Sequence, residues 1–347
     1  MTKRKRSTGV TIYDLAAELN VSPSTVSRAL NDHKGIGKKT KKAVKELAKK
    51  REYLPNNFAY SLRTKKSKTI GILVSWINRP FISTLISGIE RAAREAGYHV
   101  IITQTHDKLH VEIENLRTLL ESGISALIVS LSMETKKYDH FSIVPDNDIP
   151  IVYVDRIPKM KDINKVHINN FEAAFEATEH LIEQGCKRIS HFGGSRHQLI
   201  YAERRKGFIA AIEKHNCIVD ESIILESDNL SAEEGFRLAE TVLNSDNPPD
   251  GIFCANDAAA VSAIRYAKAE GIKIPQELAI MGFNNDPICE IVEPQLSSVS
   301  HPALEMGEVA VEQALGILNR SHRAGLSVDL TLGTSIIVRG STKRNDK

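Results

Sequence analysis

Three short segments near the start of the chain repeat their apolar residues at helical spacing. Their apolar positions are Ile12, Leu15, Ala16 and Leu19, then Val26, Ala29 and Leu30, and then Ala43, Val44, Leu47 and Ala48. Spacings of three and four residues place each set on one face of a helix. Thr11 with Asp14 has the pattern of a capping box, and Ser22 followed by Pro23 suits the start of the second helix. The pattern predicts an all-α helix-turn-helix bundle.

From Thr69 onward, short apolar runs alternate with amphipathic segments. The runs are residues 69–75, 100–105, 126–131, 151–155, 188–193, 251–255 and 278–283. Near-continuous apolar runs of this length are typical of parallel strands that are covered on both faces. Residues 81–96 form one of the intervening helices, with Leu85, Ile86, Ile89, Ala92 and Ala93 directed inward. The alternation predicts an α/β body with doubly wound parallel sheets.

Length and composition limit the class of protein. The chain of 347 residues is long for a single core and suggests two or three domains. No apolar run approaches the ~18–20 residues of a membrane span. The basic start of the chain is followed by polar residues, where a signal peptide would have an apolar stretch. We therefore expect a cytoplasmic protein that makes no use of a membrane.

Cysteine and histidine patterns give little support for a metal or redox centre. The cysteines lie about thirty residues apart in apolar surroundings and form no CxxC pair, so we expect buried thiols at Cys186, Cys217, Cys254 and Cys289. His106 and His110 could share a helix face, which leaves metal binding as an alternative, but the glutamate of an HExxH motif is missing. We expect no metal and no cofactor.

Charge is divided unevenly along the chain. Residues 1–68 hold 18 lysines and arginines against 5 acidic residues, whereas the remainder holds 28 against 38. A compact basic segment on an acidic body suits phosphate contact by the segment and repulsion of the body from DNA. A solvated lysine-rich tail is the alternative, but the helical scaffold argues against it. Double-stranded DNA is therefore the expected partner.

The second helix of a helix-turn-helix bundle enters the major groove, so its outward residues are candidates for base or phosphate contacts. This outward set is Pro23, Ser24, Thr25, Ser27 and Arg28. Arg28 can bond a guanine bidentately, or it can contact phosphate instead. The third helix adds lysines for phosphates, namely Lys38, Lys39, Lys41, Lys42, Lys45, Lys49 and Lys50.

Residues 11–31 read TIYDLAAELNVSPSTVSRALN, and YLPN follows at positions 53–56. This ungapped stretch resembles the DNA-binding signature of the LacI/GalR family of bacterial regulators, and the resemblance covers essentially the whole chain. It implies a DNA-binding domain over residues 1–55, a hinge helix and linker over 56–67, and an effector-binding and dimerisation body over 68–347. The body would have two lobes, as in type I periplasmic sugar-binding proteins. The N-lobe would span about 68–167 and 300–330, and the C-lobe about 168–299 and 331–342.

The resemblance also implies which residues contact DNA. They are Thr11, Ser22, Pro23, Ser24, Thr25, Ser27, Arg28, Asn31, Asn56, Ala59, Leu62 and Arg63. Leu62 would be the wedge that enters the central base step, and its alternative role is packing against the hinge helix of a partner. Pro23 departs from the polar or aromatic residues common at its position, which leaves the outer half-site sequence open.

Polar residues follow the apolar runs of the body, where ligands bind on sheets of this kind. No glycine-rich phosphate loop and no GxSxG motif follows any of the runs. By the resemblance, the effector contacts are Arg79, Phe81, Asp155, Arg156, Gln198, Arg204, Asn256, Asp257 and Asn284. Leu230, Ile200 and Asn284 depart from the family pattern, so we expect an atypical effector.

Four arginines near this cleft favour an anionic sugar derivative: Arg79, Arg156, Arg196 and Arg204. The resemblance implies a repressor that binds a near-palindromic operator as a homodimer, and the short polar C-terminus offers no heptad zipper for a tetramer. Two alternatives remain, a periplasmic binding protein and an α/β enzyme. The first has no use for residues 1–65, and the second would need a catalytic pair such as Asp155 and Asp257.

Overall fold

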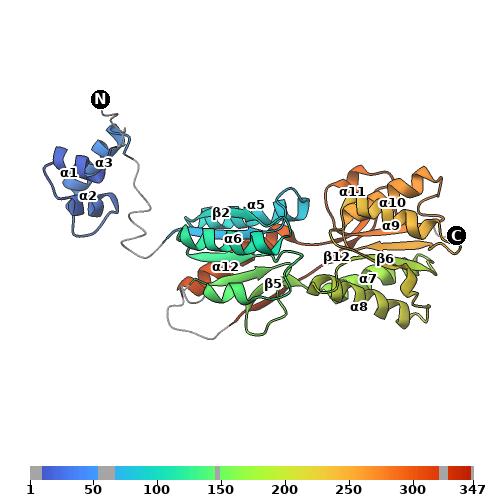
Figure 1. Cartoon of the computed structure of the whole chain (residues 1–347). Coiled ribbons are helices and arrows are strands. Elements are labelled where there is room, and N and C mark those ends of the chain that lie inside the picture. Colours follow the sequence, from blue (N-terminus) through green and yellow to red (C-terminus); the bar gives the residue numbers. More distant parts are fainter. Residues whose placement is uncertain (1–9, 54–66, 145–148, 320–326, 345–347) are drawn as a thin grey trace, which may run out of the picture. The chain divides into compact units, whose positions relative to one another are not determined.

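The chain forms two compact units, residues 1–67 and residues 68–347 (Figure 1). The structure, a computed structural model, describes residues 10–53, 67–144, 149–319 and 327–344. Within these ranges, none of the helices has the length and apolar character needed to cross a bilayer.

Residues 10–53 of the small unit form a bundle of three helices, α1 (Ile12–Glu18), α2 (Pro23–Leu30) and α3 (Lys38–Lys50). The predicted capping box is confirmed, because the Asp14 carboxylate accepts the Thr11 N–H at 2.7 Å and the Thr11 hydroxyl accepts the Asp14 N–H at 3.3 Å. Ser22 caps α2 through its hydroxyl, which accepts the Thr25 N–H. The apolar faces of the three helices meet in one small core.

The N-lobe of the body is built on a parallel sheet of six strands, in the order β11-β5-β4-β3-β1-β2. The strands are β1 (Thr69–Val74), β2 (His99–Gln104), β3 (Ala126–Val129), β4 (Ile151–Val154), β5 (Asn164–Ile168) and β11 (Asp329–Leu332). The helices of this lobe are α5 (Pro80–Glu95), α6 (Leu109–Glu121), the 3-10 helix η1 (Asp139–Ile143) and α12 (Ala303–Asn319).

The C-lobe repeats this architecture with the order β12-β10-β9-β8-β6-β7. Its strands are β6 (Ile189–Gly194), β7 (Ile224–Ser227), β8 (Gly251–Cys254), β9 (Ala279–Asn284), β10 (Ser297–Ser300) and β12 (Ser335–Ile337). Its helices are α7 (Asn170–Glu183), α8 (Leu199–Lys214), the 3-10 helix η3 (Glu221–Ile223), α9 (Ala232–Leu243), α10 (Asp257–Ala269) and α11 (Ile288–Ile291). All pairs are parallel except β10 with β12.

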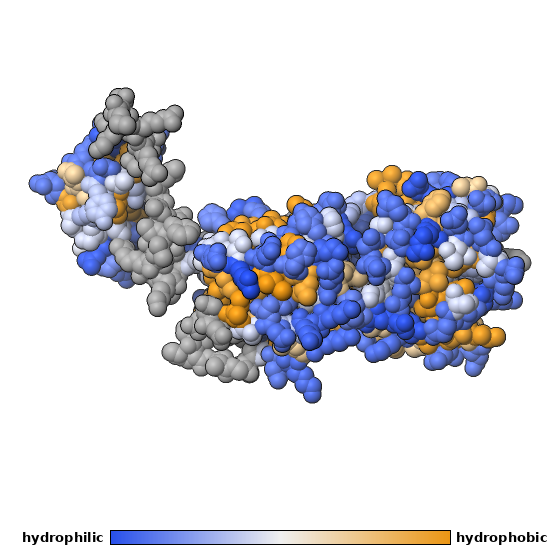
Figure 2. Space-filling model, in the orientation of Figure 1, coloured by the Kyte–Doolittle hydropathy of each residue, from blue (hydrophilic) through white to orange (hydrophobic). Residues whose placement is uncertain are grey.

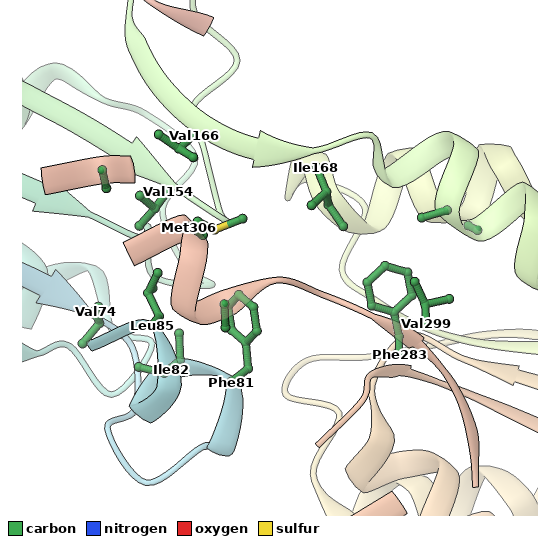
Figure 3. Close-up of a cluster of buried hydrophobic side chains, with 14 of the residues drawn as sticks. Val74, Phe81, Ile82, Leu85, Val154, Val166, Ile168, Phe283, Val299 and Met306 are labelled. Atoms are coloured by element: carbon green, nitrogen blue, oxygen red, sulfur yellow. The ribbon is translucent and has the colours of Figure 1, made fainter. Parts of the chain in front are cut away.

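The chain passes between the lobes after β5, after β10 and after β11. One apolar cluster follows these crossings from lobe to lobe (Figure 3). It includes Phe81 and Met306 of the N-lobe, Ile168 at the end of β5, and Phe283 and Val299 of the C-lobe. The lobes therefore share a hydrophobic core at the crossing segments.

The two-lobe α/β body agrees with the sequence analysis, and strands form within all seven predicted apolar runs. The pattern missed β5, β7, β10, β11 and β12, because these short strands carry polar residues and have no continuous apolar run. The expectation of full coverage is wrong for β2, where Ile101 and Ile102 are 36% and 42% exposed. β2 is the outermost strand of its sheet. Cys217 is half-buried, whereas the other three cysteines are buried as expected.

Candidate DNA interface and ligand cleft

The outward face of α2 presents Ser24 and Arg28 to solvent, while Pro23 and Thr25 are half-buried. Asn31, directly after the helix, is exposed, and its amide nitrogen donates to the Ser27 carbonyl oxygen at 2.8 Å. Arg28 lies in the last turn of α2, and an exposed guanidinium at this end of the helix can reach base edges or phosphates.

Two predicted contact residues already use their hydroxyls within the bundle. The Ser22 hydroxyl accepts the Thr25 N–H at 3.2 Å, and the Thr11 hydroxyl donates to the Asp14 carboxylate at 2.7 Å. Both residues are exposed. Their first role is to fix the start of a helix, and phosphate contact would come in addition.

Ser27 does not point outward, and this part of the sequence analysis is wrong. Its side chain is buried, with 8% exposure. Pro23, Val26, Ser27 and Leu30 are spaced i, i+3, i+4 and i+7, so Ser27 shares the inner face of α2. The same spacing rule that located the helices could have revealed this.

The lysines of α3 divide into paired and unpaired groups. Lys45 pairs with Asp32 at 2.7 Å, and Lys41 donates to the Asp32 carbonyl oxygen at 2.9 Å. Lys42 lies 3.9 Å from Glu46. The lysines without a partner among the residues that the structure describes are Lys38, Lys39, Lys49 and Lys50. These are the better candidates for phosphate contact.

Four further residues of the predicted DNA interface lie outside the described residues: Asn56, Ala59, Leu62 and Arg63. Nearly all of the predicted hinge segment, residues 56–67, does so as well. Their roles stay predictions.

A cleft of about 450 Å³ opens between the lobes, at the carboxyl ends of strands from both sheets. Seven of the nine predicted effector residues line it, namely Arg79, Phe81, Asp155, Arg156, Arg204, Asn256 and Asn284. Leu230 and Ile200, which depart from the family pattern, line it too. Folding therefore brings residues from six separate segments of the chain to one cavity.

Gln198 and Asp257 are not among the residues that line this cleft. Asp257 is buried, and its carboxylate accepts the Asp286 N–H and the Ser298 hydroxyl, both at 2.7 Å. Gln198 is also buried and donates to carbonyl oxygens of the other lobe. Arg196 pairs with Glu226 outside the lining.

The effector contacts expected from the resemblance leave out several lining residues, including Trp76, Tyr201, Asn229 and Asp286. Trp76 and Asp286 each lie two residues beyond a strand, where the strand-end rule applies, and Asp286 is among the polar residues that follow the last apolar run. Tyr201 lies within α8 and Asn229 follows a strand that the pattern missed. His106 and His110 do not share a helix face, because His106 precedes α6 and packs edge-on against Trp76.

The buried arginines of the cleft are held by fixed partners. Arg156 donates to Asp107 and to the Leu131 carbonyl oxygen at 3.3 Å, while Trp76 Nε1 donates to the other Asp107 oxygen at 3.0 Å. Arg204 donates to Asn170 at 2.9 Å and to the Ala255 carbonyl oxygen at 2.7 Å.

Arg204 also lies over the Phe283 ring, 3.5 Å from its centre. Burial lowers the pKa of Arg204 to about 10, so its side chain remains charged at neutral pH. These contacts fix a positive charge in the wall of the cleft.

The acidic residues of the cleft are poorly solvated. Burial raises the pKa of Asp155. Burial, and then the nearby Asp257, raise the pKa of Asp286 to about 7. Because Asp286 is partly protonated at neutral pH, the cleft carries less negative charge than its composition suggests.

A basic helix-turn-helix unit joined to a two-lobe body with a polar cleft defines a DNA-binding regulator with a periplasmic-binding-protein-like body. Two family models match the chain. The lacI family of bacterial regulatory proteins matches residues 11–56, and the periplasmic binding protein-like domain matches residues 178–342.

Similar known proteins and solved structures agree with these family matches. The chain is 32% identical to catabolite control protein A of Staphylococcus epidermidis, over 89% of this chain and 93% of the relative. It is 29% identical to the HTH-type transcriptional repressor CytR of Escherichia coli, over 99% of both chains. A solved periplasmic binding protein/LacI transcriptional regulator from Alkaliphilus metalliredigens, in complex with D-xylulofuranose, is 26% identical with a TM-score of 0.69. That match covers 80% of this chain and 100% of the other.

The chain therefore belongs to the lacI family of bacterial regulatory proteins and is a DNA-binding transcriptional regulator.

Proposed function

We propose that this regulator is a cytoplasmic repressor that binds a near-palindromic operator as a homodimer and is controlled by a small anionic sugar in the interlobe cleft. The observation that carries the proposal is a cleft lined by three arginines and by aromatic rings, on a body joined to a helix-turn-helix unit. The relative CytR, named as a transcriptional repressor, supports the direction of control.

The donors that remain free favour an anion. Arg156 uses only Nη1, and Arg204 uses Nε and Nη1, in contacts with protein atoms that the structure describes. Each guanidinium therefore keeps N–H groups for a ligand. Arg79 adds a third, with a single bond to the Asn229 carbonyl oxygen at 3.2 Å. These donors suit a carboxylate or a phosphate.

Aromatic faces in the same cleft suit a sugar ring. Trp76, Phe81 and Tyr201 line the cavity beside Asn256 and Asn284, whose amides can bond hydroxyl groups. The solved relative in complex with D-xylulofuranose supports a sugar-like effector. We propose Arg79, Phe81, Asp155, Arg156, Arg204, Asn256 and Asn284 as its contacts.

Isothermal titration calorimetry with neutral sugars, sugar acids and sugar phosphates tests the effector class. We expect heat of binding from sugar acids or sugar phosphates. Arg79→Gln should weaken this binding, whereas Arg196→Gln, the same change outside the cleft lining, should not. Tight binding of only an uncharged sugar would contradict the anionic class.

The proposed DNA contacts follow from exposure and charge in the small unit. Ser24 and Arg28 face solvent on α2 and would meet base edges or phosphates. Thr11, Ser22, Pro23, Thr25 and Asn31 would approach the backbone beside them. Leu62 would enter the central base step, flanked by Asn56, Ala59 and Arg63. Genome-wide mapping of bound DNA should yield a near-palindrome, and no enriched palindrome would contradict specific regulation.

A partly exposed apolar face of the N-lobe supports the homodimer. A groove of about 470 Å³ is lined by Ile77, Ser83, Ile86, Ile102 and Gln104, on β2 and at α5. Figure 2 shows hydrophobic residues gathered on this part of the body. A two-fold axis would bury this face against its own copy. Ile102→Glu should shift sedimentation toward the monomer, whereas Ile218→Glu, an exposed control in the C-lobe, should not.

Two other functions have less support. The Asp257 carboxylate, half of the catalytic pair that an enzyme would need, is already occupied by Asp286 and Ser298. The relatives are named as regulators. A periplasmic binding protein would leave the DNA-binding unit without a role.

A further inference from the structure

Two loops interlock across the lobes at a place that is separate from the three crossing segments. Met133, in the loop after β3 of the N-lobe, lies 7% exposed in the apolar cluster of the C-lobe, with Phe192, Ile200 and Tyr201. In the opposite direction, Leu199 of the C-lobe packs against the N-lobe cluster that contains Leu73 and Leu131. Met133 thus enters the core of the C-lobe, and Leu199 covers part of the N-lobe core from outside.

Hydrogen bonds reinforce this contact. Gln198 is 2% exposed, and its side-chain nitrogen donates to the carbonyl oxygens of Ser132, Met133 and Thr135, at 2.8, 3.2 and 3.3 Å. The neighbouring His197 ring also bonds the Met133 carbonyl oxygen. An intramolecular hydrogen bond is a modest net gain over bonds to water, so these bonds resist separation of the lobes.

The N-lobe side of the contact is stiff. Glu112 is fully buried, and its carboxylate accepts the Ser132 N–H at 2.7 Å, the Ser132 hydroxyl at 3.0 Å and the Thr135 hydroxyl at 2.7 Å. His140 Nε2 lies 2.9 Å from the same carboxylate. A fully bonded buried carboxylate holds the loop in one conformation.

The interlock is also connected to the cleft. The Met133 N–H donates to Asp107 at 3.1 Å, and Asp107 accepts from Arg156 and Trp76, which both line the cavity. Movement of the loop therefore reaches the cleft wall through the Asp107 carboxylate, and also through the bond from Arg156 to the Leu131 carbonyl oxygen at 3.3 Å.

We infer that residues 131–135 and 197–199 form an interlobe lock that sets how far the cleft opens, and that Gln198 positions the lobes without contacting the effector. The influence of the lock on effector binding rests on the proposed function, whereas the influence of the lock on the opening of the cleft does not. Effector-free protein therefore tests the lock whether or not an anionic sugar binds.

Trp76, the only tryptophan in the chain, lines the cleft and reports its opening. Acrylamide quenching of Trp76 fluorescence is measured for wild type, Gln198→Leu and the control Gln295→Leu, all below the unfolding transition. Gln295 is an exposed glutamine of the C-lobe whose amide donates to the Glu290 carbonyl oxygen within the same lobe. Loss of the Gln198 bonds should shift the balance toward the open cleft on the order of tenfold. Quenching should therefore rise in Gln198→Leu and stay unchanged in Gln295→Leu.

Equal quenching of wild type and Gln198→Leu would overturn the lock. If Gln198→Leu does not fold, Gln198→Glu keeps a polar side chain of the same length and sets a carboxylate against three carbonyl oxygens. Increased quenching in this variant supports the lock, and unchanged quenching overturns it. If none of the sugars, sugar acids and sugar phosphates binds in calorimetry, that result contradicts the proposed effector but not the lock.

Discussion

Gly207 allows α8 to pack closely against α7 in the C-lobe. A Cβ atom at this position would lie 2.1 Å from the Phe171 carbonyl oxygen and 2.9 Å from the Phe175 nitrogen. Non-bonded heavy atoms make favourable contacts at about 3.5 Å, so Gly207→Ala requires the helices to separate by more than about 1 Å. Both opposing atoms belong to the backbone and cannot rotate away.

The expected cost follows from this overlap. Overpacking of a core typically costs about 1–3 kcal/mol, and the rigid backbone of α7 favours the upper end. Alanine regains about 0.5–1 kcal/mol over glycine within a helix. The net loss in free energy of unfolding should therefore be about 2 kcal/mol.

Gly316→Ala is the matched control, because Gly316 also lies in a helix, α12, and a Cβ there meets nothing within 4 Å. This variant should gain about 0.5–1 kcal/mol from helix propensity alone. Urea unfolding followed by circular dichroism and by Trp76 fluorescence measures both variants. A Gly207→Ala midpoint at or above that of wild type would refute the close packing of α7 and α8.

Three further predictions concern DNA binding, stability and effector binding. Arg28→Ala should cost about 1–3 kcal/mol of specific operator affinity with little change on scrambled DNA, whereas Lys38→Ala should weaken both alike, as measured by fluorescence anisotropy. Burial lowers the pKa of His191 to about 4, below the ordinary 6.5. Up to about 3 kcal/mol of stability that is present above pH 6.5 should therefore be lost as the pH falls toward 4. His191→Phe should reduce this loss in urea titrations, and an unchanged pH profile would contradict the prediction. Because protonation of Asp286 removes a negative charge, an anionic sugar should bind more tightly at pH 6 than at pH 8, and calorimetry of Asp286→Asn should show a weaker pH dependence.

Local spacing in the sequence was sufficient for the helices of the small unit. The capping box of Thr11 and Asp14, and the cap at Ser22, involve residues within three positions of each other. Such contacts form wherever the local pattern occurs, so the sequence predicts them. The burial of Ser27 was equally local and could have been predicted.

The body was predictable where strands are central and apolar, and less so elsewhere. β5 and β7 are short and carry polar residues, and only pairing with neighbouring strands identifies them. The exposure of Ile101 and Ile102 depends on the position of β2 at the edge of its sheet, which periodicity does not reveal.

By itself, the sequence determined the basic helix-turn-helix unit and the α/β class of the body, because helix faces and apolar strand runs are local properties. The family resemblance, and not a local pattern, pointed to the seven predicted effector residues that line the cleft. Only the tertiary structure decided that Gln198 bonds three carbonyl groups 63 to 66 residues away and that Met133 packs in the opposite lobe. These contacts join segments distant in the chain, and their partners are fixed only when two separately folded sheets meet.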